Sequence, residues 1–348
     1  MAKKKSNKAF GTVIVLLALV LAAFFIYRKY LGARVQLKDR NYIYIFIRPE
    51  DDFSDLLEEL EETGVIAKQE DFQWLAERME LPQNLHPGRF RINNGMNLRQ
   101  IVNLLKYNKQ EKVKLSLNSQ IHNLDEFVLY LDDKLGLEAM DIEALLADEK
   151  LLDEKFGLDP DNCFALIVPG TYEVSWAISR DELIDLLAQR YKKLWAPERL
   201  AQCKRVGFRV DEIVTIASIV QSESAIESEQ EKIAGVYINR LKKNMPLQAD
   251  PTLKFANRNF GVSRVLDADK EINSPYNTYR YKGLPPGPIC LVSQQAIDAT
   301  LNYGRHNYLY FCAKPQLNGF SDFSQSYEQH RRHAAAYQKA LDKIGISR

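Results

Sequence analysis

The sequence has 348 residues, of which 46% are hydrophobic and 27% are charged, a composition typical of a folded protein with material for two or three domains. Lys and Arg total 47 against 46 for Asp and Glu, so the formal net charge is +1 and the basic surplus of a nucleic-acid-binding protein is absent. No nucleic acid partner is therefore expected.

An uncharged run of 18 residues, "FGTVIVLLALVLAAFFIY", occupies positions 10–27. As a helix it would be roughly 27 Å long, close to the hydrocarbon thickness of a bilayer. The lysines ahead of it slightly favour a cytoplasmic N-terminus. A cleaved signal peptide is the alternative, but the run is longer than the apolar core of such peptides. We predict a cytoplasmic tail at 1–9, a transmembrane helix at 10–27 and a linker at 28–40.

Residues 41–112 carry strand and helix patterns in turn. The alternation in "NYIYIFIRP" is typical of a strand, and "EDDFSDLLEELEETGVI" places Phe53, Leu56 and Leu60 at helical spacing. A second helix is predicted at 70–80, and "HPGRFRINNGMNLRQIVNLLKY" predicts a short strand followed by another helix. This α+β unit contains no cluster of catalytic residue types, so the sequence indicates a binding or spacer module.

Residues 113–348 are predicted to be mainly helical at first and rich in loops later. Helices are expected at about 209–224 and 229–243. Ser228 followed by Glu231 matches a capping box, which predicts that the second of these helices begins there. Glu223 would then lie at the C-terminal end of the first helix, beside a chain reversal of the kind that often carries a site.

Glu223 interrupts an apolar stripe. Ile213, Ile216, Ile219 and Val220 have the spacing of a buried helical face, and Glu223 continues that face. Burial disfavours a charged carboxylate and raises its pKa, which is what a general acid requires at neutral pH. The alternative is a glutamate at a helix end that is half exposed, or paired with an arginine or lysine of the next helix, Arg240 or Lys232.

A late loop, "SPYNTYRYKGLPPGP", combines aromatic rings with hydroxyl and amide groups. Such a set suits sugars, whose apolar ring faces are edged with hydroxyl groups. The alternative is a proline-stiffened structural loop whose tyrosines pack against the body of the domain. No phosphate loop, dinucleotide fingerprint or nucleophile elbow is visible in the sequence.

The four cysteines are Cys163, Cys203, Cys290 and Cys312. A disulfide framework is one alternative. A chain of this size does not need disulfide bonds to fold, however, so free buried thiols are the simpler interpretation. The five histidines show no metal-binding spacing with acids or cysteines. We therefore expect neither a metal site nor a cofactor.

Six segments occur in a fixed order between residues 217 and 311: "ASIVQSES", "KIAGVYINRL", "MPLQADPTL", "SPYNTY", "GLPPGPI" and "YLYF". Together they resemble the YceG-like endolytic murein transglycosylases. The layout ahead of them, an anchor followed by a LysM-like module at 41–112, also resembles that family. The implied fold class is α+β, with a single N-terminal transmembrane helix, a small LysM-like α+β module and a mixed α/β catalytic domain at 113–348.

The resemblance also implies a function and a site. Members of the family are bacterial inner-membrane proteins whose periplasmic domain cuts peptidoglycan strands internally without water and leaves 1,6-anhydro-N-acetylmuramic acid ends. The family's catalytic glutamate corresponds to Glu223. Many relatives carry a further glutamate where this chain has Gln221, which implies that an acid at 221 is dispensable. The candidate substrate-binding residues are Asn239, Gln248, Asp250, Tyr276, Asn277, Thr278 and Tyr279.

Two other functions stay open at this point. A non-catalytic peptidoglycan-binding scaffold would need no acid, and a hydrolytic muramidase would need a second carboxylate, for which Asp250 is the candidate. The expected partners are peptidoglycan glycan strands and the membrane, with peptidoglycan synthases or division proteins as further candidates. The expected location is the cell inner membrane, with a cytoplasmic N-terminus and a periplasmic catalytic domain.

Overall fold

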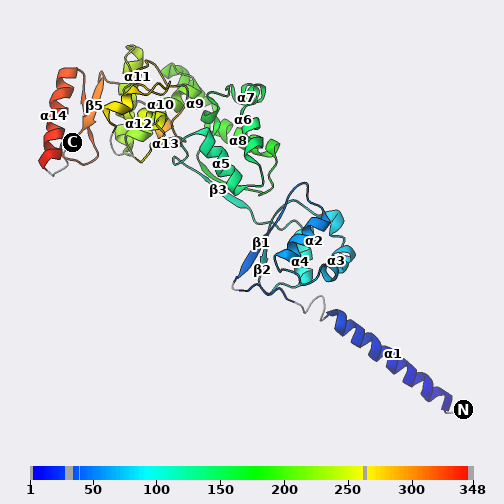
Figure 1. The fold of residues 1–348 in the computed structure, drawn as a ribbon. Coiled ribbons are helices and arrows are strands. Elements are labelled where there is room, and N and C mark those ends of the chain that lie inside the picture. Colours follow the sequence, from blue (N-terminus) through cyan, green and yellow to red (C-terminus); the bar gives the residue numbers. More distant parts are fainter. Residues whose placement is uncertain (1–2, 28–33, 39, 262–264, 344–348) are drawn as a thin grey trace. The chain divides into compact units, whose positions relative to one another are not determined.

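The computed structural model describes residues 3–27, 34–38, 40–261 and 265–343 (Figure 1). Over these residues the chain combines many helices with two-stranded sheets, so the predicted α+β class is confirmed. Contacts divide it into two compact units. The first comprises Met1–Lys114, Lys134–Gly136 and Glu173–Ile178, and the second comprises Leu115–Asp133, Leu137–Tyr172 and Ser179–Arg348. The LysM-like character of residues 41–112 stays a prediction.

The N-terminal helix α1 runs over Lys3–Tyr27. Where the structure describes side chains, it contains no helix that is both long enough and apolar enough to span a membrane. The predicted transmembrane segment at 10–27 includes positions 10, 11, 25 and 26, whose side chains lie outside that described part. The anchor therefore stays a prediction.

The first unit is built on an antiparallel pair of strands. β1 pairs with β2 so that Ile43 lies opposite Ile92 and Ile45 opposite Phe90. Side chains alternate across a strand, so the apolar residues collect on one face and three helices cover it. The elements of this unit are β1 (Tyr42–Ile47), α2 (Phe53–Glu62), α3 (Gln69–Arg78), a 3-10 helix (Pro82–Asn84), β2 (Gly88–Asn93) and α4 (Leu98–Lys106).

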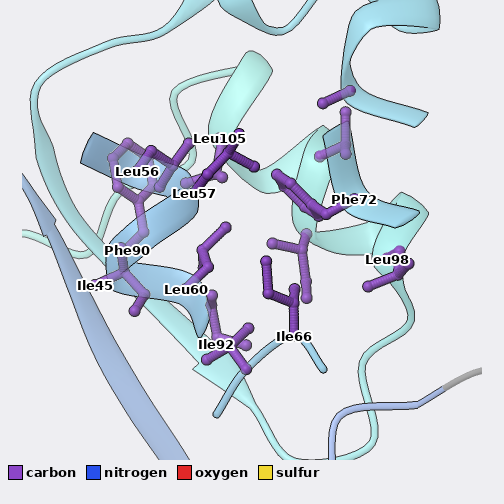
Figure 2. Close-up of a cluster of buried hydrophobic side chains, with 14 of the residues drawn as sticks. Ile45, Leu56, Leu57, Leu60, Ile66, Phe72, Phe90, Ile92, Leu98 and Leu105 are labelled. Carbon is purple, nitrogen blue, oxygen red and sulfur yellow. The ribbon is translucent and has the colours of Figure 1, made fainter. Parts of the chain in front are cut away.

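Side chains from every one of these strands and α-helices meet in a single core (Figure 2). Two of the helices begin with capping boxes: Asp52 caps α2, and Asn97 caps α4 with Gln100 as its partner. Such caps satisfy backbone N–H groups that the helix leaves unpaired, so the helix ends are fixed by local sequence. The residues labelled in Figure 2 are Ile45, Leu56, Leu57, Leu60, Ile66, Phe72, Phe90, Ile92, Leu98 and Leu105.

The remaining elements are mostly helices. β3 pairs with β4, and β5 pairs with β6 as an antiparallel hairpin. In chain order these elements are β3 (Val113–Leu117), α5 (Leu124–Lys134), α6 (Ala139–Leu146), α7 (Glu149–Phe156), a 3-10 helix (Cys163–Leu166), β4 (Gly170–Val174), α8 (Arg180–Leu194), α9 (Pro197–Val206), α10 (Val210–Glu223), α11 (Glu227–Lys242), α12 (Asp250–Ala256), a 3-10 helix (Asp267–Glu271), α13 (Gln294–Leu301), β5 (Tyr310–Ala313), β6 (Ser321–Ser324) and α14 (Tyr327–Lys343).

Three helices of the second unit, α10, α11 and α13, pack against one another and form its centre (Figure 1). Ile219 and Val220 of α10 meet Ile233 and Tyr237 of α11 in a cluster that also includes Ile289. This packing brings the C-terminal end of α10 beside the middle of α11. The four cysteines carry free thiols, three of them buried and Cys312 partly exposed.

Removing a core side chain should weaken the first unit strongly. Leu60 is fully buried in the cluster of Figure 2, so Leu60→Ala should lower the free energy of unfolding by about 2–5 kcal/mol through lost burial and the cavity left behind. Glu58→Ala, on the exposed side of the same helix, should change it by less than about 0.5 kcal/mol. Chemical denaturation followed by tryptophan fluorescence measures both, and equal effects would contradict the described core.

Candidate active site

Glu223 is the last residue of α10, as the sequence predicts. The helix ends because Ser224 is extended, with φ −151° and ψ 137°, so the chain turns away toward α11. The C-terminal end of a helix carries the negative end of its dipole, which disfavours a further negative charge. Glu223 as a whole residue is partly exposed, whereas its helix is buried from Ile213 to Val220.

The predicted start of α11 at Ser228 is wrong. The helix begins at Glu227, and the residue before it, Ile226, supplies no side-chain cap. The turn is held instead by Ser224, whose hydroxyl oxygen accepts a hydrogen bond from the Ile226 N–H at 3.1 Å. The backbone carbonyl of Ser224 accepts a hydrogen bond from the Gln230 amide at 2.7 Å. These bonds close a short turn between the two helices, so the helix starts before the capping pattern suggests.

Tyr237, on α11, holds the Glu223 side chain. Its hydroxyl group donates a hydrogen bond to Glu223 Oε1 at 2.7 Å, and the residue is only 2% exposed. Its ring packs edge-on against Phe311 of β5, which fixes the direction of the hydroxyl group. Sequence reasoning missed this residue. The available signal was a tyrosine within the apolar run "AGVYI", because a buried tyrosine normally finds a partner for its hydroxyl group.

The pKa of Glu223 is raised from its ordinary value to about 7. Burial is the main cause, and the negative charge of Asp250 acts in the same direction. The hydrogen bond from Tyr237 lowers the pKa, as do the positive charges of Lys254 and Arg240. The raised pKa that the apolar stripe predicts is therefore confirmed. Near neutral pH the group is populated in both protonation states, so it can give a proton and later take one.

Glu223 has neither of the ionic partners considered from the sequence. Arg240 is buried, and its guanidinium group donates to the backbone carbonyls of Leu309 at 2.6 Å and Leu247 at 2.7 Å. Lys232 instead lies 3.5 Å from the buried carboxylate of Glu229. The positive charge of Arg240 therefore acts on Glu223 from a fixed position without forming a salt bridge with it.

Asp250 is the second carboxylate of the site. It is the first residue of α12, where the helix dipole favours a negative charge, and it is exposed. Its Oδ1 accepts a hydrogen bond from the Tyr279 hydroxyl group at 2.5 Å. Burial raises the pKa of Tyr279 first, and the bond to Asp250 raises it further. The three groups influence one another: the charge of Asp250 raises the pKa of Glu223, and the charges of Asp250 and Glu223 both raise the pKa of Tyr279.

Asn277 and Thr278 are buried, and their polar atoms bind within the protein. The Asn277 amide donates to the carbonyls of Lys270 at 2.7 Å and Ile272 at 2.9 Å. The Thr278 hydroxyl group accepts from the Ala249 N–H at 3.0 Å. Asn277 therefore fastens the loop at 274–281 to the segment at 270–272, and Thr278 fastens it to the start of α12.

The other predicted contact residues differ in whether their side chains are exposed to solvent or bound within the protein. Tyr276 is partly exposed, and its ring lies 4.4 Å from that of Phe255. Gln248 is exposed and has a left-handed backbone, with φ +53°, which is strained for a residue other than glycine. The Asn239 amide donates to the carbonyls of His306 at 2.7 Å and Tyr308 at 3.0 Å. Asn239 therefore holds the chain ahead of β5.

Gln221, two residues before the end of α10, joins this helix to the segment ahead of α13. Its Nε2 donates to the Leu291 carbonyl at 3.0 Å, and its Oε1 accepts from the Ser293 N–H at 2.9 Å. Both ends of the amide are thus matched to the backbone. A glutamate here would place an oxygen against the Leu291 carbonyl, so the amide suits this chain better than a charged carboxylate.

Among the described residues, no group of three or more His, Cys, Asp or Glu side chains is placed to hold a metal ion. The chemistry that the arrangement offers is proton transfer by Glu223. Tyr237 orients that group. The charge of Asp250 raises its pKa, and the charges of Lys254 and Arg240 lower it.

Comparison with known proteins gives consistent matches. A sequence model of the YceG-like family matches residues 45–336. An endolytic murein transglycosylase of Bacillus subtilis is 27% identical over 333 residues, which is 92% of this chain and 91% of that protein. A protein of the same name from Streptococcus pneumoniae is 32% identical over 175 residues, only 31% of its own length. A crystal structure of a YceG-like protein from Listeria monocytogenes is 26% identical with a TM-score of 0.57, covering 84% of this chain and 98% of that one.

Removing the Tyr237 hydroxyl group should raise the pKa of Glu223 above its present value of about 7. The hydrogen bond favours the charged carboxylate and so lowers the pKa of Glu223. Without that bond, in Tyr237→Phe, the effect of burial raises the pKa further. Tyr279→Phe is the matched control, because that hydroxyl group binds Asp250 instead. NMR titration of carboxyl-labelled glutamate measures both variants. An unchanged or lower pKa in folded Tyr237→Phe would contradict the assigned hydrogen bond.

Proposed function

This chain belongs to the YceG-like family, and on that basis we propose that it is an endolytic lytic transglycosylase. Its substrate would be the glycan strands of peptidoglycan, cut between N-acetylmuramic acid and N-acetylglucosamine. The name of the Bacillus subtilis relative, which is matched over 91% of its length, supports the substrate class. The observation that carries the proposal is Glu223, a carboxyl group with a pKa of about 7 that Tyr237 holds in place.

One carboxyl group is enough for this reaction. Protonated Glu223 gives its proton to the glycosidic oxygen as the bond to C1 of the muramic acid residue breaks. The resulting carboxylate then takes the proton of the C6 hydroxyl group of the same sugar, whose oxygen closes onto C1. The products are a strand with a free hydroxyl group and a strand with a 1,6-anhydro end, and Glu223 is protonated again. Because the attacking hydroxyl group belongs to the substrate, its effective concentration is already high.

The surrounding groups match that cycle. A pKa near 7 means that neither the donation nor the recovery of the proton is strongly uphill at neutral pH. Tyr237 can donate its hydrogen bond to the carboxylate form and so stabilises the state reached after the first transfer. The fixed positive charge of Arg240 acts on the same state. The site thus supports both halves of the reaction with the same groups.

A hydrolytic muramidase is the second candidate, because Asp250 is a further carboxylate whose charge acts on Glu223. In that reaction the second carboxylate would activate water or attack the sugar. The Tyr279 hydroxyl group bonds Asp250, which suits a charge that orients the substrate. The two reactions leave different ends on the strand, anhydro ends against reducing ends, so the products distinguish them.

Glu223→Gln should abolish the activity. The amide keeps the size of the side chain but has no titratable proton, and general acid–base catalysis is worth about 10² to 10⁴ in rate. Both halves of the cycle use this group, so the variant should release almost no anhydro-ended strands from purified glycan, as measured by mass spectrometry. Glu227→Gln, in the exposed first turn of α11, is the control and should keep most of the activity. Parental rates in folded Glu223→Gln would refute the mechanism.

We also propose that segment 10–27 anchors the enzyme in the cell inner membrane, with a periplasmic catalytic domain. The support is the uncharged run of 18 residues behind several lysines. From that position the enzyme would act on strands beside the membrane, so a role in cell wall biogenesis and in the termination of glycan strands follows. Peptidoglycan synthases and division proteins are the candidate partners there.

The proposed topology predicts the behaviour of a reporter. A reporter that is active only outside the cytoplasm, fused to the C-terminal end of the chain, should be active in cells, and the mature protein should stay in the membrane fraction. The same fusion without residues 10–27 should be inactive, because nothing would carry the reporter across the membrane. A soluble mature protein with a processed N-terminus would overturn the anchor.

A further inference from the structure

The last helix, α14, is held on the β5–β6 hairpin by a narrow stripe of side chains. It packs against both strands (Figure 1). No residue of α14, which the structure describes throughout, is buried. Its half-buried residues begin at His330 and recur at i+3, i+4, i+7, i+8 and i+11, the spacing of one helical face. Little apolar area is therefore removed from water, so the helix is docked weakly and single side chains can decide its position.

His330 meets the hairpin through an aromatic stack. Its ring lies on that of Tyr310 of β5, with ring centres 5.4 Å apart and ring planes inclined by 22°. The guanidinium group of Arg240, on α11, also lies over the Tyr310 ring, 5.1 Å from its centre. Tyr327 of α14 adds a third ring, 6.2 Å from that of His330. The stack therefore places His330 close to the fixed positive charge of Arg240.

The docked position suits a neutral His330 and not a charged one. Within the part of the chain that the structure describes, Nδ1 of His330 is buried and has no hydrogen-bond partner. A neutral imidazole can carry its proton on Nε2, whereas protonation adds an N–H group at Nδ1. A buried donor without an acceptor is unfavourable. Burial accordingly lowers the pKa of His330, and the positive charges of Arg240 and His333 act in the same direction.

His333, three residues further along the same face, meets the hairpin in a different way. Its Nδ1 lies 3.0 Å from the hydroxyl oxygen of Ser324, a fully buried residue of β6. Ser324 is opposite Tyr310 in the hairpin register, so the two histidines dock on one residue pair. A hydroxyl group can donate to a neutral imidazole nitrogen and accept from a protonated one. The contact of His333 therefore tolerates both protonation states, and that of His330 does not.

We propose that α14 is an acid-sensitive latch on the β5–β6 hairpin, docked while His330 is neutral and released when His330 takes up a proton. The groups that face His330 are Arg240 from α11, Tyr310 from β5, and Tyr327 and His333 from α14 itself. In the described chain, no carboxylate is among the charged groups that act on it. Water is therefore the better environment for a protonated His330, and the helix reaches water by leaving the hairpin.

The direction of the pH effect follows from the two states of the helix. In released α14 His330 is exposed to water and has an ordinary pKa of about 6.5, whereas in docked α14 its pKa is lower. Well above about pH 6.5 His330 is neutral in both states, and docking is at full strength. As the pH falls below that value the released state takes up the proton first. Docking then weakens by up to about tenfold for each pH unit, until the pKa of the docked state is passed.

Release of α14 would reach the Glu223 site through the hairpin. Phe311 of β5 packs edge-on against Tyr237, which holds Glu223. Arg240 lies over the neighbouring Tyr310 ring, and its charge lowers the pKa of Glu223. The helix thus supports the strand that supports the site. The docking equilibrium itself does not depend on the reaction proposed for Glu223.

Hydrogen exchange of the detergent-solubilised full-length protein measures the docking. Backbone amides of α14 are followed by mass spectrometry at about pH 7.5 and about pH 5.5, on either side of the ordinary histidine pKa. Rates are corrected for the pH dependence of intrinsic exchange. Protection of α14 in the parent should fall several-fold, up to about tenfold, at the lower pH. The amides of α2, in the other compact unit, are the internal reference and should keep their protection.

Two variants assign the effect to one histidine. His330→Phe keeps an aromatic ring on Tyr310 but has no titratable nitrogen, so the ratio of its α14 protection at the two pH values should be close to one. The ratio is the measure because it stays informative if the phenylalanine changes the strength of docking at both pH values. His333→Gln is the matched control. Its amide can still donate to and accept from Ser324, and its protection should fall with pH as in the parent.

Three results would overturn the latch. The first is equal α14 protection in the parent at the two pH values. The second is a fall in His330→Phe as large as that in the parent. The third is a parallel fall in α2, which would show general destabilisation by acid in place of release of one helix. Because the readout is backbone exchange, failure here leaves the proposed reaction untouched, and failure of the reaction leaves the latch to be judged by exchange alone.

Discussion

The hydrogen bond between Tyr237 and Glu223 is the constraint around which the site is organised. Burial raises the pKa of a carboxyl group, so burial alone would keep Glu223 protonated near neutral pH. A single neutral donor, fixed by the packing of α10 against α11, offsets part of that tendency without adding charge. The result is a group balanced between its two forms near neutral pH. Helix packing therefore sets the chemistry, because it decides where the hydroxyl group lies.

Most of the other polar residues in the site's motifs serve the backbone. Gln221 holds the segment at 291–293, and Thr278 and Asn277 hold the loop at 274–281. Arg240 holds the chain just ahead of α12 and just ahead of β5. Each has its polar atoms matched to carbonyl or N–H groups, which buried loops would otherwise leave unpaired. The loops around Glu223 are thus fixed by side chains, and Asp250 and Tyr279 are presented from anchored positions.

The sequence was informative where local physics decides the structure. The apolar period of α10 placed Glu223 at its end, and the alternation in β1 predicted a strand. It was misleading at Ser228, because hydrogen bonds to Ser224 closed the turn earlier. The sequence did not indicate the role of Tyr237, because its partner Glu223 is 14 residues away and the two meet only through helix packing. Residue type likewise did not show that the polar atoms of Asn277 and Thr278 face inward, since a buried amide and a ligand-binding amide look the same in sequence.

Contacts that bind a substrate and groups that move protons contribute differently to catalysis. Contacts that are equally strong before and during the reaction tighten binding without speeding the chemical step, so a face remote from the reacting bond affects affinity alone. Glu223 acts only where protons move, and so it affects the barrier. For an enzyme that cuts inside a polymer the division is useful, because holding any part of a strand raises the local concentration of its other bonds. A carboxyl group that is populated in both its protonated and its ionised form near neutral pH suits the chemical step, because it can give a proton and take one back.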